Sequence, residues 1–401
     1  MTSPSEPIRL TRRRTALLAV PAAAAAATAA TALRSEPAEA RPPAGRVRLR
    51  RDPGSVVRAA EVDVATDPGP MARGGTLVAS LASDRFGLVA LTWRKGEAAP
   101  DLQLRVRRGG DWRPWQKVHV LHDGPNSGNR EADGDREGSD LVWARDADAV
   151  QVRRASGRVP AGLRVVLIDP GMRDADDAPD SPSLTRAARR NAKGRPTKPP
   201  LRGRRLWGAD ERLTSGRPSY CNRLQQVHLH HTVNANDYGK KDVPGLIRGM
   251  YRYHTQSLGW SDIGYNFLVD RFGRIWVGRK GGPTKLVRGA HTLGFNHTSV
   301  GIAVIGNMEA GRPSDRTVTA IVMLAAWKLR KAGKSPIGRS KVRSEGSDRF
   351  APGRVVWLPR IDGHRDTNET ACPGIKLYNR LPEIRRRAQR RWKRGVKQNR
   401  G

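Results

Sequence analysis

Apolar residues follow two different patterns along the chain, and the change falls near residue 170. Between residues 46 and 170, short apolar runs such as "TLVASL", "FGLVALTWR" and "LRVVLID" are separated by clusters of Gly, Asp and Pro. Strands at this spacing, with turn signals between them, predict an antiparallel β sandwich. We therefore expect residues 46–170 to form a β-rich N-terminal domain, whose role the pattern does not indicate.

From residue 205 onward, predicted strands alternate with predicted helices. "LQQVHLHH" and "SVGIAVIG" have the composition of buried strands, whereas "DVPGLIRGMYRYHTQSLG" and "DRTVTAIVMLAAWKLRKAG" have apolar residues at helical spacing. Strands interleaved with helices around one sheet are typical of a mixed α/β domain. We expect residues 205–381 to form such a domain, with a central β-sheet flanked by helices.

Two further segments have too few apolar residues to form a core. Residues 171–204 are rich first in Asp, Ser and Pro and then in basic residues and Pro, which predicts a disordered basic linker. Residues 382–401 are strongly basic and are expected to begin as a helix and to end as a C-terminal tail.

The N-terminal segment has the pattern of an export signal. "TRRRTALLAVPAAAAAATAATAL" joins a twin-arginine start to an alanine-rich stretch, and Ala38-Glu39-Ala40 fits a small-x-small cleavage site. The stretch is too weakly apolar to predict a spanning helix. We expect residues 1–40 to be a twin-arginine-type signal peptide. The processed protein would then be secreted, extracellular or cell-wall associated, and without a membrane span.

The net charge of the chain restricts its possible partners only in part. The chain has 74 Lys and Arg against 38 Asp and Glu, a formal net charge of +36, which implies anionic partners. Nucleic acid, an acidic cell-wall polymer and a membrane surface all fit this charge, and the bias towards Arg also fits a GC-rich genome. No nucleic-acid-binding motif accompanies the charge, and the export signal argues against a nucleic-acid partner.

The candidate chemistry involves the two cysteines and a cluster of histidines. In an oxidising compartment, Cys221 and Cys372 would by default form a disulfide. However, His364 precedes Cys372 closely, and together with one histidine of "VHLHHT" they would give three zinc ligands and an open fourth position. Such a site favours hydrolysis of an amide or ester. Strand alternation places His228 and His230 on one face. It does not decide which of the two binds the metal, and it does not decide whether Cys372 binds a metal or forms a disulfide.

Five motifs occur in one order along the second domain, and together they are specific. They are "WGAD" at 207–210, "HHT" at 230–232, "GWSDIGYNFLVD" at 259–270, "GAHTLGFNHTSVGIAVIGN" at 289–307 and "GHRDTNETACPG" at 363–374. In this the chain resembles the peptidoglycan recognition protein family, which includes zinc-dependent N-acetylmuramoyl-L-alanine amidases. With its β-rich N-terminal domain and export signal, it is most similar to secreted actinobacterial members.

The resemblance implies a role for each matching residue. It makes His230, His364 and Cys372 the ligands of a Zn²⁺ ion, places Tyr265 beside the zinc water, and makes Thr370 a residue that stabilises the oxyanion. A phenol or hydroxyl near the metal can meet the negative oxygen of a tetrahedral intermediate, so the chemistry agrees with these roles. His231 then becomes a packing residue, and the role of His228 stays open.

Four residues are weaker candidates for substrate contact. His291 and Asn296 resemble residues that line the peptide-binding groove, although stabilising hydrogen bonds within the loop are the alternative. Arg279 is expected to face an acidic group of the stem peptide. Trp260 fits a groove wall or a core position equally well, and His254 is expected to pack in the core or near the groove rather than to bind a metal.

Cys221 has no intramolecular partner if Cys372 binds zinc. Relatives often pair a cysteine at this place with one shortly after the first zinc histidine, where this chain has Lys240 and Lys241. We expect Cys221 to be buried and inert, or open to intermolecular oxidation.

The combined prediction is a secreted zinc hydrolase that uses a metal-activated water. It would cleave the amide between N-acetylmuramic acid and L-alanine of peptidoglycan. The alternative is a non-lytic peptidoglycan-binding protein, although members of that kind typically lack the ligating cysteine. Anionic wall polymers are expected as further partners of the basic segments.

Overall fold

The computed structural model describes residues 46–64, 76–126, 134–178, 198–234 and 236–397. Contacts divide the chain into residues 1–39 and a compact unit of residues 40–401. The predicted signal peptide, residues 1–40, lies outside the described residues. No helix in the described ranges combines the length and the apolar character needed to span a membrane.

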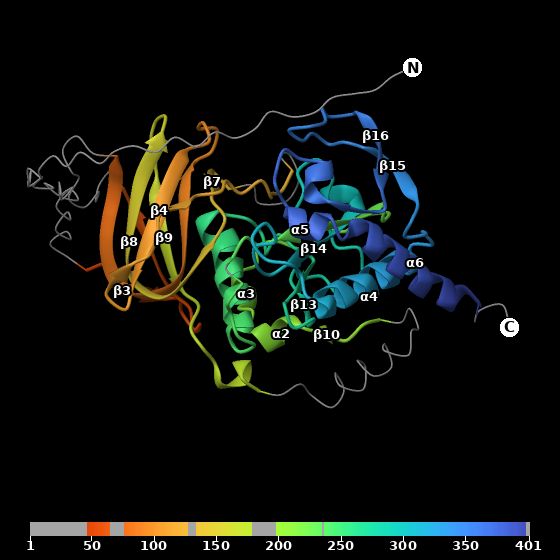
Figure 1. The fold of residues 1–401 in the computed structure, drawn as a ribbon, viewed down its shortest axis with the longest axis horizontal. Coiled ribbons are helices and arrows are strands. Elements are labelled where there is room, and N and C mark those ends of the chain that lie inside the picture. Colours follow the sequence, from red (N-terminus) through yellow and green to blue (C-terminus); the bar gives the residue numbers. More distant parts are fainter. Residues whose placement is uncertain (1–45, 65–75, 127–133, 179–197, 235, 398–401) are drawn as a thin grey trace, which may run out of the picture. The chain divides into compact units, whose positions relative to one another are not determined.

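The N-terminal part of the compact unit is a β-sheet. Its strands, among the described residues, pair antiparallel in the order β1-β2-β9-β3-β8-β4-β5, with β6 beside β4 and β7 beside β3 (Figure 1). The strands are β1 (Arg50–Arg51), β2 (Arg58–Asp63), β3 (Leu77–Arg94), β4 (Asp101–Arg108), β5 (Asp111–Trp112), β6 (Gln116–Lys117), β7 (Arg136–Gly138), β8 (Val142–Ser156) and β9 (Arg164–Asp169). The predicted antiparallel strands are thus found, and their packing as a two-layer sandwich stays a prediction.

The alternation of side chains explains why the sheet forms. In β4, Leu102, Leu104 and Val106 are buried, whereas the residues between them are more exposed. Successive side chains of a strand point to opposite faces, so each strand contributes one apolar row. One core cluster joins such rows from β3, β4, β8 and β9.

The second half contains a mixed sheet of six strands in the order β10-β13-β12-β14-β11-β17. Its neighbours are parallel except for β12 and β13, which are antiparallel. The strands are β10 (Leu201–Arg202), β11 (Gln226–His231), β12 (Phe267–Val269), β13 (Ile275–Val277), β14 (Ser299–Val304) and β17 (Ile361–Gly363), with a separate hairpin of β15 (Arg339–Arg343) and β16 (Val355–Pro359). The predicted mixed sheet is confirmed.

Helices cover both faces of this sheet (Figure 1). Helices α4 (Asp315–Lys331) and α6 (Leu381–Lys397) share one core cluster with the sheet, and α3 (Asp242–Arg252) shares the other. The short helical segments are η1 (Asp174–Asp176), α2 (Arg204–Trp207), η2 (Glu211–Leu213), η3 (Tyr253–Ser257), η4 (Asn296–Thr298), η5 (His364–Asp366) and α5 (Ile375–Tyr378). The predicted basic helix is found as α6, whose Ile384 and Ala388 are buried against the domain, and residues 398–401 lie outside the described ones.

Helix α3 is buried on almost every side because it packs against both sheets. A Cβ at Gly249 would lie 2.2 Å from Leu88 Cδ1 of β3, so only glycine permits this close approach. Arg248 forms a buried ion pair with Asp176, with 2.7 Å between Nη2 and Oδ2.

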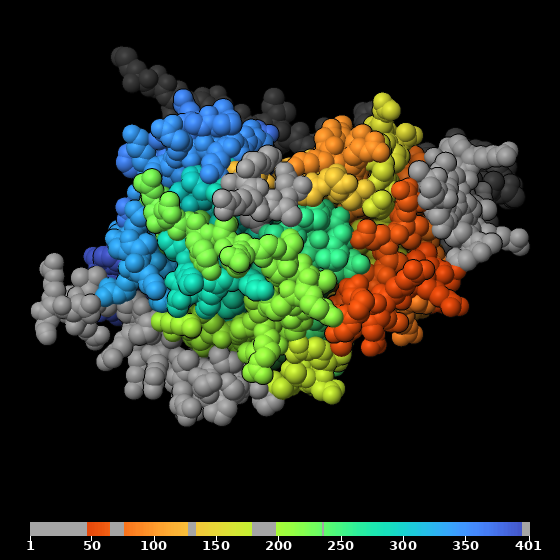
Figure 2. Space-filling model, turned by 180° about the vertical axis from the view of Figure 1, so that it is seen from behind, coloured from red at the N-terminus to blue at the C-terminus, as the bar shows by residue number. Residues whose placement is uncertain are grey.

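The ends of the predicted linker are also ordered. Asp176 lies in η1 and Leu201–Arg202 form β10, so the prediction of disorder across residues 171–204 is wrong at both ends. The physical reason is the Arg248–Asp176 pair at one end and the strand pairing of β10 with β13 at the other. On the face shown in Figure 2, residues 46–64 lie beside α3, and Arg252 pairs there with Asp52 at 3.1 Å.

Candidate metal centre

The first two candidate ligands meet because their strands are neighbours. β11 and β17 are parallel, with Leu229 opposite Gly363, so His230 and His364 follow at the same edge of the sheet. Their ring centroids are 4.6 Å apart, and both side chains are buried. His230 and His364, which are far apart in the sequence, therefore lie together at the carboxyl ends of two neighbouring strands.

Cys372 completes the cluster through a tight return of the chain after η5. The backbone N–H of Arg365 donates to the carbonyl of Cys372 at 2.9 Å, which brings the cysteine back to the histidine. Cys372 Sγ lies 3.6 Å from His230 Nδ1, and the donor atoms of His230, His364 and Cys372 all lie within 4.8 Å of one another. Cys372 is 8% exposed.

The residues fit a Zn²⁺ ion by donor chemistry and by protonation. Two imidazoles and a thiolate are donors that zinc prefers. Burial lowers the pKa of His230 and of His364 well below its usual value, which keeps both imidazoles neutral and able to bind a metal. Burial raises the pKa of the Cys372 thiol, so the thiol must release a proton when a metal binds.

His291 contacts the second ring nitrogen of His230. Its Nδ1 lies 3.1 Å from His230 Nε2, which leaves His230 Nδ1 directed towards Cys372. A partner on the second ring nitrogen fixes the orientation of a metal-binding histidine. His291 is fully buried, and this places it behind His230 rather than at a surface open to substrate.

The structure adds Asp123, which the sequence had not singled out. Asp123 Oδ1 lies 3.4 Å from His230 Nδ1 and 3.3 Å from His364 Nδ1. Its Oδ2 accepts a hydrogen bond from the hydroxyl of Tyr265. Asp123 belongs to an irregular segment, "VLHDGPN", in which no local motif marks it as a site residue.

The two predicted catalytic residues flank this cluster. The Tyr265 ring centroid is 5.5 Å from that of His230, and burial together with Asp123 raises the pKa of the Tyr265 phenol well above its usual value. Thr370 Oγ1 accepts from the N–H of Cys372 at 3.1 Å. Thr370, Asp123, His364 and Cys372 line a cavity of about 150 Å³.

The other candidate substrate residues have structural contacts. Asn296 is fully buried, and its Oδ1 accepts from the N–H groups of His291 and Thr292 at 2.9 and 3.1 Å. Arg279 is 6% exposed and donates to Ser261 Oγ at 2.9 Å. For Asn296 these contacts match the alternative of loop-stabilising hydrogen bonds.

Trp260 has both of the positions that were considered for it. It is 6% exposed and stacks on His254, with ring centroids 4.4 Å apart. It also lines a cavity of about 270 Å³ together with Asp123 and Gly124. His254 is buried in the core, as predicted, and accepts from the N–H of Gly264 at 3.2 Å.

The two remaining histidines of "VHLHHT" do not join the cluster. His231 Nδ1 accepts from the N–H of Met308 at 3.1 Å, and burial lowers the pKa of His231 to about 3, as expected for a packing residue. His228 Nδ1 lies 2.7 Å from Asp362 Oδ1, and both side chains are fully buried.

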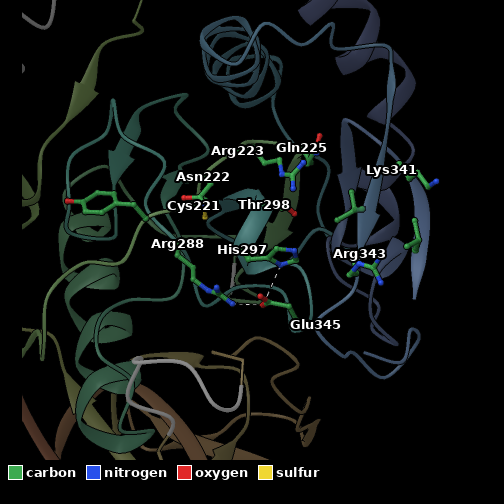
Figure 3. A pocket seen from close by; sticks show the side chains of 13 residues that line it. Cys221, Asn222, Arg223, Gln225, Arg288, His297, Thr298, Lys341, Arg343 and Glu345 are labelled. Carbon is green, nitrogen blue, oxygen red and sulfur yellow. Dashed lines mark hydrogen bonds and ion pairs between the residues drawn. The ribbon is translucent and has the colours of Figure 1, made fainter. Parts of the chain in front are cut away.

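Cys221 lies at a separate cavity of about 480 Å³, drawn in Figure 3. The cavity is lined by Arg223, Arg288, Lys341, Arg343 and Glu345, among others. The Cys221 thiol donates to the carbonyl of Asn296 at 3.4 Å, and burial raises the pKa of this thiol to about 11. Because the thiolate is the reactive form, this environment keeps Cys221 unreactive.

The fold and the cluster define a protein with an amidase-type domain, and comparison with known families agrees. Residues 220–375 match the family described as N-acetylmuramoyl-L-alanine amidase. Residues 26–188 match the family described as Rv3811 N-terminal galactose-binding domain-like.

Individual relatives narrow this class. The chain is 30% identical over 175 residues to peptidoglycan-recognition protein SC2 of Drosophila melanogaster, which covers 44% of this chain and 80% of the relative. It is 30% identical over 185 residues to peptidoglycan-recognition protein SA of the same organism, covering 46% and 78%. Among solved structures, Drosophila PGRP-LB wild-type is similar at 27% identity and a TM-score of 0.36, covering 45% of this chain and 91% of that one. The chain belongs to the peptidoglycan-recognition protein family.

Proposed function

We propose that the protein is a secreted, zinc-dependent N-acetylmuramoyl-L-alanine amidase. The observation that carries the proposal is the convergence of His230, His364 and Cys372 within 4.8 Å of one another. A non-lytic binding protein has no need for a buried cysteine at this position beside two neutral imidazoles. Membership of the family and the match of residues 220–375 support peptidoglycan as the substrate class.

The reaction is hydrolysis of the amide between the lactyl group of N-acetylmuramic acid and L-alanine. Oxygen from water forms a bond to the carbonyl carbon, the C–N bond breaks, and a proton goes to the departing amine. Zinc, when bound by His230, His364 and Cys372, supplies a Lewis acid for this chemistry.

Two side chains of the chain have proposed roles in the reaction. Tyr265 keeps its proton because burial raises the pKa of its phenol, so its O–H can donate to the oxygen of the substrate carbonyl as negative charge develops. The Thr370 oxygen already accepts from Cys372 N–H, which leaves its own proton for the same oxygen. His291 acts by holding the ring of His230 in place.

The test is the product released from purified peptidoglycan. We expect the protein to release new L-alanine amino termini and no new reducing sugars, and we expect a chelator to stop the release. Cys372→Ser should abolish the release, whereas Cys221→Ser, the matched control, should not. Binding of peptidoglycan without release by the wild type would favour the non-lytic alternative.

We further propose that the basic segments hold the protein on anionic wall polymers after export by the twin-arginine route. The formal charge of +36 supports this proposal. Elution of the protein from isolated walls by raised salt tests it, because salt screens such contacts. Retention at high salt would contradict it.

A further inference from the structure

The carboxylate of Asp123 is directed at the candidate metal centre from outside the amidase motifs. Its side chain is 5% exposed, and within the described part of the chain Oδ1 has no hydrogen-bond partner. This oxygen is almost equally far from the two candidate histidine donors, at 3.4 Å from His230 Nδ1 and 3.3 Å from His364 Nδ1. A buried carboxyl oxygen without a hydrogen-bond partner is costly, so its position needs an explanation.

Three of the donor separations match those of a tetrahedral zinc site. Zn–N bonds of about 2.0–2.1 Å and Zn–O bonds of about 2.0–2.2 Å place neighbouring N and O donors about 3.3 Å apart, and a Zn–S bond of about 2.3 Å places N and S about 3.6 Å apart. The observed separations are 3.4 and 3.3 Å for Asp123 Oδ1 and 3.6 Å for Cys372 Sγ. By its distances to the two histidines, Asp123 Oδ1 is placed as a further donor beside them.

The residues around Asp123 occupy the predicted substrate side of the site. We define residues 119–126 as the covering segment. Tyr265 donates to Asp123 Oδ2, and Asn296 Nδ2 donates to Gly124 O at 2.9 Å and to Asn126 Oδ1 at 3.0 Å. Tyr265, a predicted catalytic residue, and Asn296, a predicted groove residue, thus both contact the covering segment.

We propose that Asp123 is the fourth protein ligand of the metal, and that the covering segment closes the centre as a His₂-Cys-Asp site in the resting protein. The proposal rests on the proposed function for the identity of the metal. A site with four protein ligands is of the closed kind, whereas a catalytic site keeps one position open. Substrate then reaches the centre only after the covering segment has moved.

The contacts of the covering segment fit a part that can move without unfolding the domain. Its backbone pairs with β7 and the turn after it, through Leu121 N to Gly138 O at 2.9 Å and Asp140 N to His119 O at 2.8 Å. On the amidase side, its side-chain contacts include those to Tyr265 and Asn296 and an ion pair of His122 with Asp348 at 4.0 Å. Releasing it therefore leaves the sheet with β11 and β17 intact.

The test uses the full chain loaded with Co²⁺ in place of zinc, because the absorption spectrum of Co²⁺ reports the number and kind of its ligands. Wild type and Asp123→Ala are titrated with the metal in competition with a chelator, and azide is then added as a small anionic ligand. We expect Asp123→Ala to bind Co²⁺ at least about tenfold more weakly, since even loss of a supporting residue costs about 10–100-fold. Azide should change the spectrum of Asp123→Ala and leave that of the wild type unchanged.

Asp140→Asn is the matched control. It removes a neighbouring carboxyl, whose pKa is raised well above its usual value by burial and by Asp123, without removing the proposed donor. Its spectrum and its response to azide should equal those of the wild type. Asp123→Ala should also release L-alanine termini from peptidoglycan faster than the wild type.

The outcomes separate this proposal from the proposed function. If the wild type binds one Co²⁺ and Asp123→Ala has the same affinity, spectrum and azide response, Asp123 is not a ligand and only this inference is overturned. The same holds if Asp123→Ala keeps the wild-type spectrum and loses activity, which would make Asp123 a residue that acts on substrate. If the wild type binds no stoichiometric metal, the proposed zinc amidase itself fails.

Discussion

The metal donors and the covering segment meet at one point, yet they are held in very different ways. His230 and His364 lie at the ends of two neighbouring parallel strands, β11 and the edge strand β17, so strand pairing fixes their separation. Asp123 lies on an irregular segment with few hydrogen bonds to the amidase side. Rigid elements give a site its precision, and loops give it its control over access. In this protein the amidase half thus holds the metal donors precisely, and the N-terminal half controls access to them.

The largest expected effect comes from separating the two halves. Arg248→Met removes the buried partner of Asp176, which keeps Arg173 Nε at 3.4 Å. Loss of one partner of a buried pair costs up to about 3–5 kcal/mol in the free energy of unfolding. Urea unfolding measures this, and the double variant Arg248→Met/Asp176→Leu should recover most of the loss. A loss below about 1 kcal/mol would mean that the two halves are not joined by this pair.

Removal of the Tyr265 hydroxyl tests the region that contains the metal donors. Tyr265→Phe should lower the rate of L-alanine release by about 100–1,000-fold, the usual cost of losing a donor to a developing oxyanion. Measured in the Asp123→Ala background, this effect is free of any change in the contact with Asp123. Metal affinity should stay unchanged, and a rate within twofold of the parent would remove Tyr265 from the reaction.

The stability of the sheet that carries the metal donors depends on pH through Lys328, which belongs neither to the metal centre nor to the covering segment. Burial lowers the pKa of Lys328 to about 8, and its ammonium donates to the carbonyls of Pro283 and Lys285 at 3.2 and 2.8 Å. Below about pH 8 the buried Lys328 side chain is charged in the folded protein, which costs folding free energy. Between about pH 8 and 10.5 the unfolded chain binds more protons, so stability rises with pH by up to about 3 kcal/mol. Compared with Lys328→Met, the wild type should therefore gain stability from pH 7 to pH 9.5, and parallel curves would contradict this.

The smallest expected effect concerns the covering segment alone. Asn126→Ala removes one of the two acceptors that the segment offers to Asn296, keeps the other at Gly124 O, and keeps the contacts that Asn296 makes to its own loop. One such bond contributes about 1 kcal/mol, or about a fivefold change in an equilibrium. L-alanine release should rise by about this factor. A fall would indicate that the segment helps substrate to bind.

The donors could be predicted from sequence, and the covering segment could not. "HHT" and "GHRDTNETACPG" identify His230, His364 and Cys372 because strand periodicity and a motif constrain them locally. Asp123 meets them through packing between segments more than a hundred residues apart, which leaves no local period. A local signal is likewise missing for the pairing of Arg248 with Asp176, which are 72 positions apart, and for the burial of Ile384 and Ala388 in the basic helix α6.

The burial of α3 has a consequence for any attempt to divide the protein. One core cluster combines Leu88 and Ile168 of the N-terminal sheet with Leu246, Ile247 and Met250 of α3. The halves that match two separate families are thus not interchangeable modules, because they share one apolar interior. A fragment that begins after the first match would expose this side of α3 to water, and exposed apolar patches of that kind promote aggregation. Activity of the amidase half should therefore be sought in the intact chain rather than in an excised piece.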